Sequence, residues 1–283
     1  MTVTDKIKIK IGIMGYPPFK FNKKFIKKWK SDIFEIVGDI ETRRFRKQPS
    51  DSGSWRFLEW IKRFMVTREP NNGKKQHSWI YKDSLLEKEF PENRKVDFSI
   101  WITYVPIEDN YFVRRLSSNR IVLTYFGMYD ILKRGFIPVE NLLLRTIYRH
   151  ILVYMRYDEH IPVHKDKKIN FTHDDTHGCI FDMNVNKEDV VFSLDKPTIC
   201  DECIEQIRIA GVADNSVNQI KKEISRIKKG FLYKITGIIK EKTLVKRNFV
   251  FLLIITVLVS TLFGIMINIA SNLIWKFLPF IPR

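Results

Sequence analysis

The longest apolar run of the chain, from Phe249 to Ile269, contains no charged residue. A helix of about 21 residues, at a rise of about 1.5 Å per residue, reaches roughly 30 Å, the hydrocarbon thickness of a bilayer. Basic residues are more frequent before the run than after it, where only Lys276 and Arg283 follow. Because the more basic flank stays in the cytoplasm, the pattern predicts a transmembrane helix over 248–277 and a short tail over 278–283. The expected product is a single-pass protein of a bacterial inner membrane, with its N-terminal part in the cytoplasm.

The net charge of +17 points to an anionic partner. One basic block lies between Lys6 and Lys30, and a second lies directly before the apolar run. The second block predicts contact with the lipid bilayer and its anionic headgroups, through Lys234, Lys240, Lys242, Lys246 and Arg247. The first block leaves nucleic acid open as a partner, although lipid is the simpler explanation for the charge as a whole.

Residues 214–247 predict one long basic juxtamembrane helix, because isoleucines and Phe231 recur at helical spacing with lysines between them. Three interpretations remain open: a short coiled coil, an amphipathic helix on lipid headgroups, and a simple stalk. The first would allow a homo-oligomer to form through residues 214–275.

Residues 1–213 carry the patterns of a cytosolic α/β (α+β) domain. Strands are predicted over 7–14, 33–40, 97–105 and 119–126, where β-branched and aromatic residues recur. Helices are predicted over 52–65 and 138–157 from apolar residues at a helical period. Strands and helices that mix in this way predict a mixed sheet covered by helices.

All three cysteines of the chain, Cys179, Cys200 and Cys203, fall within 25 residues, and His173 lies close before them. A Cys-x-x-Cys pair and a second pair from a nearby loop form a tetrahedral zinc ligand set. The predicted site is therefore one structural zinc ion per chain, held by these four residues, with His177 as a possible substitute for His173. Few cysteines, arranged in this way, also favour a reducing compartment.

A second, weaker metal site is conceivable at His150, His160 and His164. The spacing of the last two suits a helix, but Pro162 lies between them and argues against one. The chain has no glycine-rich phosphate loop, no nucleophile elbow and no dinucleotide-binding fingerprint.

The order of two strands, a long helix and a cysteine-containing tail resembles the archaemetzincins, a metzincin-like group with the zincin fold, over about residues 95–206. Cys179, Met183, Cys200 and Cys203 match the last three cysteines and the methionine of the tail that binds a structural zinc in that family, and His173 falls within one position of its first cysteine. The resemblance implies a zincin-like mixed sheet. It also implies loss of peptidase activity, because the family's HExxH motif is absent: Ile151 follows His150 where the general base is expected.

Three functions remain open. The first is a membrane-anchored, non-catalytic zinc-binding protein whose cytosolic domain binds an unknown protein partner or regulates one. The second is a membrane-perturbing effector or toxin of a bacterial antiphage-defence module, in which the cytosolic domain holds the anchor inactive. The third is a metallopeptidase-like hydrolase with an atypical site.

Overall fold

A computed structural model describes residues 5–45, 80–164, 172–173, 176–184, 186–227 and 256–268. The chain divides into two compact units, Met1–Gly230 and Phe231–Arg283. The helix predicted over 52–65 lies outside the described residues, as do the basic residues Lys234, Lys240, Lys242, Lys246 and Arg247.

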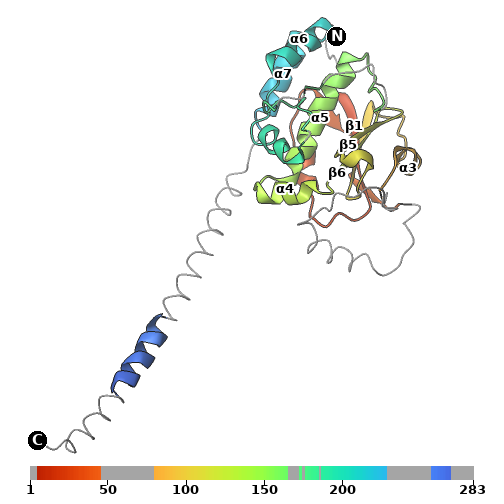
Figure 1. Ribbon diagram of the computed structural model, residues 1–283. Coiled ribbons are helices and arrows are strands. Elements are labelled where there is room, and N and C mark those ends of the chain that lie inside the picture. The colour runs from red at the N-terminus through yellow and green to blue at the C-terminus, as the bar shows by residue number, and fades with distance from the viewer. Residues whose placement is uncertain are drawn as a thin grey trace, which may run out of the picture. The chain divides into compact units, whose positions relative to one another are not determined.

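Within the described residues, the first unit is built on one mixed sheet (Figure 1). Its strands are β1 (Ile7–Met14), β2 (Phe34–Ile36), β3 (Glu41–Arg43), β4 (Phe98–Thr103), β5 (Val113–Leu116) and β6 (Arg120–Thr124). The strand order is β2-β1-β4-β6-β5, with β3 also paired to β1. Every pair is parallel except β5 with β6, so an antiparallel strand forms one edge.

The strands at 7–14, 97–105 and 119–126 are thus confirmed in position, and 33–40 contains the shorter β2. The helices are α1 (Lys23–Lys27), α3 (Asp83–Glu89), α4 (Met128–Arg134), α5 (Val139–Arg156), α6 (Asp201–Ile209) and α7 (Asp214–Ile224). Two short 3-10 helices, η1 (Glu108–Asn110) and η2 (Lys187–Ser193), complete the described elements. The predicted α/β class is confirmed.

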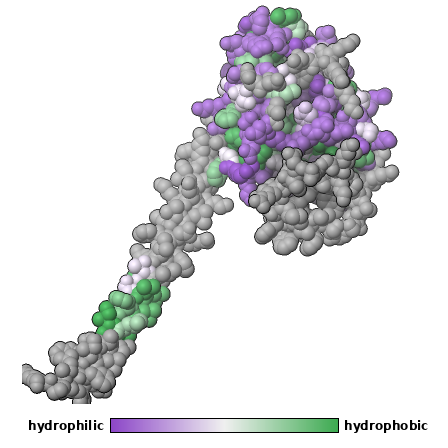
Figure 2. All heavy atoms as spheres, viewed as in Figure 1, coloured by the Kyte–Doolittle hydropathy of each residue, from purple (hydrophilic) through white to green (hydrophobic). Residues whose placement is uncertain are grey.

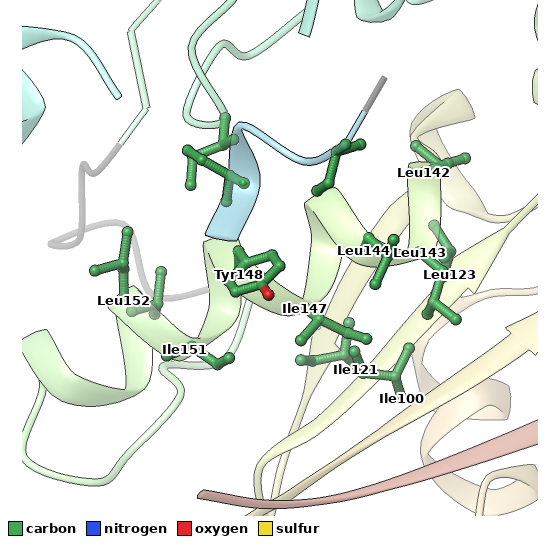
Figure 3. Close-up of a cluster of buried hydrophobic side chains, with 14 of the residues drawn as sticks. Ile100, Ile121, Leu123, Leu142, Leu143, Leu144, Ile147, Tyr148, Ile151 and Leu152 are labelled. Carbon is green, nitrogen blue, oxygen red and sulfur yellow. The ribbon is translucent and has the colours of Figure 1, made fainter. Parts of the chain in front are cut away.

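Helices cover both faces of the sheet. Successive residues of a strand point to opposite sides, and the central strand β4 carries apolar side chains on both sides. On β4, Ile100 and Ile102 belong to the core that contains α5, whereas Trp101 belongs to a second core with Leu86 of α3. Figure 3 shows the first core: Ile147 and Ile151 of α5 lie over Ile100, Ile121 and Leu123 of the strands. The α5 helix is buried along almost its whole length, so it is the central helix of the unit.

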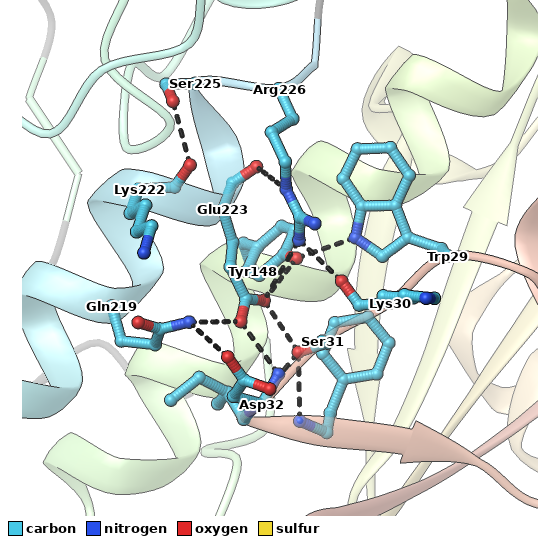
Figure 4. A network of polar contacts seen from close by, with 12 residues as sticks. Trp29, Lys30, Ser31, Asp32, Tyr148, Gln219, Lys222, Glu223, Ser225 and Arg226 are labelled. Atoms are coloured by element: carbon cyan, nitrogen blue, oxygen red, sulfur yellow. Dashed lines mark hydrogen bonds and ion pairs between the residues drawn. The ribbon is translucent and has the colours of Figure 1, made fainter.

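The α7 helix also belongs to this unit, although the sequence suggested a continuous helix over 214–247. It ends at Ile224, and Ile220 and Ile224 are buried in the same core as α5. The Glu223 carboxylate accepts hydrogen bonds from the Ser31 hydroxyl (2.6 Å) and the Asp32 amide (2.8 Å), which follow α1 (Figure 4).

The predicted transmembrane helix over 248–277 is contradicted. Among the described residues, no helix combines the length and the apolar character that are needed to cross a membrane. The described part of the run, 256–268, is helical and apolar (Figure 2). Residues 248–255 and 269–277 lie outside the described part of the chain.

Candidate metal centre

The four residues singled out by cysteine spacing come together. One ligand atom from each of His173, Cys179, Cys200 and Cys203 lies within 4.8 Å of the others. The Cys179 and Cys203 sulfurs are 4.0 Å apart, and the Cys200 sulfur is 3.5 Å from Nε2 of His173. In a tetrahedral zinc site, two sulfurs lie roughly 3.8 Å apart and a sulfur and a nitrogen roughly 3.6 Å. The group therefore has the dimensions of a tetrahedral zinc ligand set.

Two short backbone pairings bring the ligands together from distant parts of the sequence. The Thr198 amide donates to the Gly178 carbonyl (3.0 Å) and the Ile180 amide to the Thr198 carbonyl (2.9 Å), so Cys179 lies beside the segment that leads into Cys200. The backbone of Gly178 is left-handed, with a φ of +76°, a conformation that glycine adopts without strain. The Met183 amide donates to the His173 carbonyl (3.0 Å), which fixes His173 next to the same loop.

The Cys-x-x-Cys pair begins α6. Cys200 is the N-cap residue of the helix, and Cys203 lies in its first turn. The positive end of the helix dipole favours anionic thiolates there. Two amides also point at the Cys179 sulfur, from Phe181 (3.4 Å) and Cys200 (3.5 Å). N–H donors of this kind stabilise a thiolate and orient it toward a metal.

The pKa values of the three thiols shift in different directions. A hydrogen bond from Cys203 lowers the pKa of Cys179 to about 4, and the same contact raises the pKa of Cys203. Burial raises the pKa of Cys200. One thiolate is thus preformed near neutral pH, and the other two thiols must each lose a proton before they can act as metal ligands.

Asp182 supports the ligand loop. Its side chain is fully buried, and its Oδ2 accepts a hydrogen bond from the Gly178 amide (2.8 Å). Its Oδ1 lies 3.5 Å from Nε2 of His173, and burial raises the pKa of the carboxyl group. Burial of Asp182 depends on tertiary contacts that a single sequence does not reveal.

The other histidines do not join this group. His177 is exposed, and its ring centre lies 5.5 Å from that of His173. His150 is buried in α5, where its Nδ1 contacts the Thr146 carbonyl at 2.7 Å. Within the described part of the chain, His150, His160 and His164 form no second group that could hold a metal.

His164 and His160 have other surroundings. The His164 ring contacts the guanidinium of Arg114, and burial followed by that positive charge lowers its pKa. Its backbone amide pairs with the Arg115 carbonyl of the edge strand (3.0 Å), whereas the His160 amide donates to the Tyr157 carbonyl (3.1 Å). Both residues follow the end of α5 and lie outside any helix. Their spacing of four residues therefore does not bring the two rings to one helix face.

A scan against protein-family models finds no matching model, and a search of curated proteins finds no matching relative. A search of solved structures finds similarity to an archaemetzincin from Methanopyrus kandleri, at 11% sequence identity and a TM-score of 0.36. The similarity covers 72% of this chain and 95% of the other. At that TM-score the two backbones superpose only loosely, so neither fold details nor activity are transferred from it.

Proposed function

We propose that this chain is a non-catalytic zinc-binding protein, in which one zinc ion links the loop of Cys179 to the start of α6 and stabilises a regulatory or partner-binding domain. The observation that supports the proposal is the convergence of His173, Cys179, Cys200 and Cys203 within 4.8 Å. Thiolate and imidazole ligands in this number favour zinc over harder cations. Their resemblance to the cysteine tail of the archaemetzincins supports the same metal.

A structural role follows from the ligand count. Four protein ligands complete a tetrahedral shell, and a catalytic zinc needs a position left open for water or substrate. The ligand residues also adjoin the main core, since Cys179, Cys203 and their neighbours Ile180 and Ile204 are buried in it. Zinc at this place would tie the last third of the unit to the sheet, and it is expected to add to the free energy of unfolding.

The experiment is a metal analysis of the purified full-length chain and of three variants. We expect about one zinc per wild-type chain and strong loss of zinc in Cys179→Ser and Cys203→Ser. His177→Ala is the matched control, because His177 lies beside the ligands and outside their group, and it should keep its zinc. Retention of zinc in both cysteine variants would contradict the proposal.

The non-catalytic role is tested separately, with a casein digest and a mixed peptide library. We expect no metal-dependent cleavage by the zinc-loaded chain. Cleavage that disappears in His150→Ala, together with a second equivalent of metal, would instead support a hydrolase.

A further inference from the structure

The segment 20–30, which contains α1, carries six lysines and no acidic residue. Lys24, Lys27 and Lys28 of this segment are exposed. Lys27 forms an ion pair with Asp39. Lys24 and Lys28 lie one turn apart, since the Lys28 amide donates to the Lys24 carbonyl at 3.0 Å, and within the described residues neither forms an ion pair. One face of the segment therefore presents two cations that no carboxylate offsets.

Two aromatic rings lie beside these lysines. Phe25 belongs to neither core and is 40% exposed. Its ring centre lies 5.7 Å from that of Trp29, with the two rings close to perpendicular. The indole is fixed from the inside, because its Nε1 donates to the Tyr148 hydroxyl at 2.8 Å. Phe25 is thus an exposed ring held against a rigid neighbour.

A guanidinium from a distant part of the sequence completes this surface. Arg226 follows the end of α7, and its Cζ lies 4.9 Å from the centre of the Trp29 ring (Figure 4). Its Nη2 donates to the Lys30 carbonyl at 2.5 Å and lies 3.8 Å from the buried Glu223 carboxylate. The Arg226 side chain is nevertheless 45% exposed. These contacts place a third cation next to the rings before any ligand binds.

The rings and the charges together indicate which anionic partner fits. A helix that lies on a membrane needs a broad apolar face, but α1 has five residues, and Phe25 is its one exposed large apolar side chain. A duplex keeps the faces of its bases stacked on one another and presents only their edges in the grooves. An unpaired strand offers both phosphates for the cations and free base faces for a ring.

We propose that the exposed cations and rings around α1 form a binding surface for single-stranded nucleic acid. This surface consists of Lys24, Phe25, Lys28, Trp29 and Arg226. Phosphates contact the cations, which makes the affinity depend on salt, and a base stacks on the Phe25 ring without strong sequence preference. The surface shares no residue with the metal centre, so this function is additional to zinc binding.

Binding is measured by fluorescence anisotropy on the zinc-loaded full-length chain. The probe is a labelled oligothymidylate of about 20 nucleotides, which is longer than the usual site of about 4–16 nucleotides. A duplex of the same length and vesicles of phosphatidylserine and phosphatidylcholine are the comparison ligands. We expect the single strand to bind more tightly than the duplex, with an affinity that falls as sodium chloride is added.

Two variants separate stacking from charge. Phe25→Ala should weaken binding of the single strand at least fivefold, which corresponds to about 1 kcal/mol, because a stacked base loses its ring. Lys24→Gln/Lys28→Gln should reduce the slope of log affinity against log salt by about 0.7 for each lysine. All three side chains are exposed, so the zinc content should be unchanged in both variants.

Matched controls exist for both changes. Phe136→Ala alters a phenylalanine that is 45% exposed and outside the surface. Lys82→Gln/Lys88→Gln alters two exposed lysines at α3, which packs on the other face of the sheet. Both controls should bind the single strand as the wild type does.

Three results would overturn the proposal. The first is no binding of the oligothymidylate, or equal binding of the duplex. The second is unchanged binding in Phe25→Ala, which would leave no role for the exposed ring. The third is binding to the vesicles that the double lysine substitution on α1 abolishes, without binding of the oligothymidylate, and it would assign the surface to lipid headgroups.

Discussion

The carboxylate of Glu223 accepts a hydrogen bond of 2.7 Å from the hydroxyl of Tyr148, which joins α7 to α5 in the interior of the first unit. Glu223 is almost fully buried and also accepts from Ser31, the Asp32 amide and Gln219. A carboxylate enclosed by this many donors keeps its charge in the interior without a metal. One acidic side chain therefore holds the last turn of α7 against α5 and the segment after α1.

Glu223→Gln should lower the free energy of unfolding by about 2–3 kcal/mol, because the amide cannot accept all the hydrogen bonds that the carboxylate accepts. Tyr148→Phe removes one donor and should cost about 1 kcal/mol. Urea denaturation followed by tryptophan fluorescence measures both. Lys222→Gln, one residue away and exposed, is the control. A Glu223→Gln variant as stable as this control would show that the cluster contributes nothing.

Glu223 should also make the free energy of unfolding depend on pH. Burial alone would raise the pKa of Glu223, but the hydrogen bonds from Ser31, Tyr148 and the Asp32 amide outweigh it and lower the pKa below 4.5. A carboxyl group with a lowered pKa in the folded state stabilises the fold above its unfolded pKa, and this stability is lost as pH falls through the folded value. The stability difference between wild type and Glu223→Gln should therefore shrink below about pH 4.5. A difference that stays constant down to pH 3 would contradict this.

Zinc binding should release about two protons per metal at pH 8. Cys179 already ionises near pH 4, whereas the pKa values of Cys200 and Cys203 are raised, so these two thiols give up their protons on binding. Calorimetric titration in buffers of different ionisation enthalpy measures the number. Release of three protons would mean that the preformed Cys179 thiolate is absent from the metal-free chain.

Gly12→Ala should destabilise the sheet. A Cβ at Gly12 would lie 2.2 Å from the indole ring of Trp101, its partner on the neighbouring strand. Such overpacking costs about 1–3 kcal/mol, measured as a shift in urea midpoint. Trp101→Leu should remove most of the added cost in the double variant, and strictly additive effects of the two changes would rule out the clash as the cause.

His150 should remain neutral in the folded chain. Burial, followed by the charge of Arg149, lowers its pKa to about 3, so the unfolded chain takes up a proton near pH 6.5 that the folded chain does not. Its contribution to stability therefore falls as pH drops below about 6.5. NMR titration of the imidazole should show no protonation above about pH 4, and His150→Gln should lose this part of the pH dependence. An imidazole that titrates near pH 6 in the folded chain would contradict its burial.

The elements with a clear period could be predicted, and those defined by tertiary contacts could not. The alternation of isoleucines from Ile7 identifies β1, and cysteine spacing identifies the group around Cys200. The edge strand β5 is only four residues long, with two adjacent arginines, so it has no apolar pattern to recognise. The helical period that continues past Ile224 in the sequence hides the end of α7, which depends on burial of Ile220 and Glu223 against α5.

The burial of charged side chains could not be predicted from the sequence either. Arg114, Arg145 and Glu223 look like ordinary surface residues in the sequence, because charged side chains are mostly exposed. Each is tolerated inside only through partners from distant segments, as with Arg114 and Asp83 at 3.2 Å. The apolar run at 249–269 led to the opposite error: hydropathy alone predicted a membrane span, and no helix among the described residues has the length and apolar character for one.

The bond between Ser31 and Glu223 joins residues 192 positions apart, and it has a consequence for synthesis on the ribosome. The early strand β1 lies inside the sheet, where its partner β4 is made much later. The N-terminal third of a nascent chain therefore emerges with apolar strand edges uncovered, and the unit closes only once α7 has left the exit tunnel. During that interval the uncovered strand edges favour association with other chains.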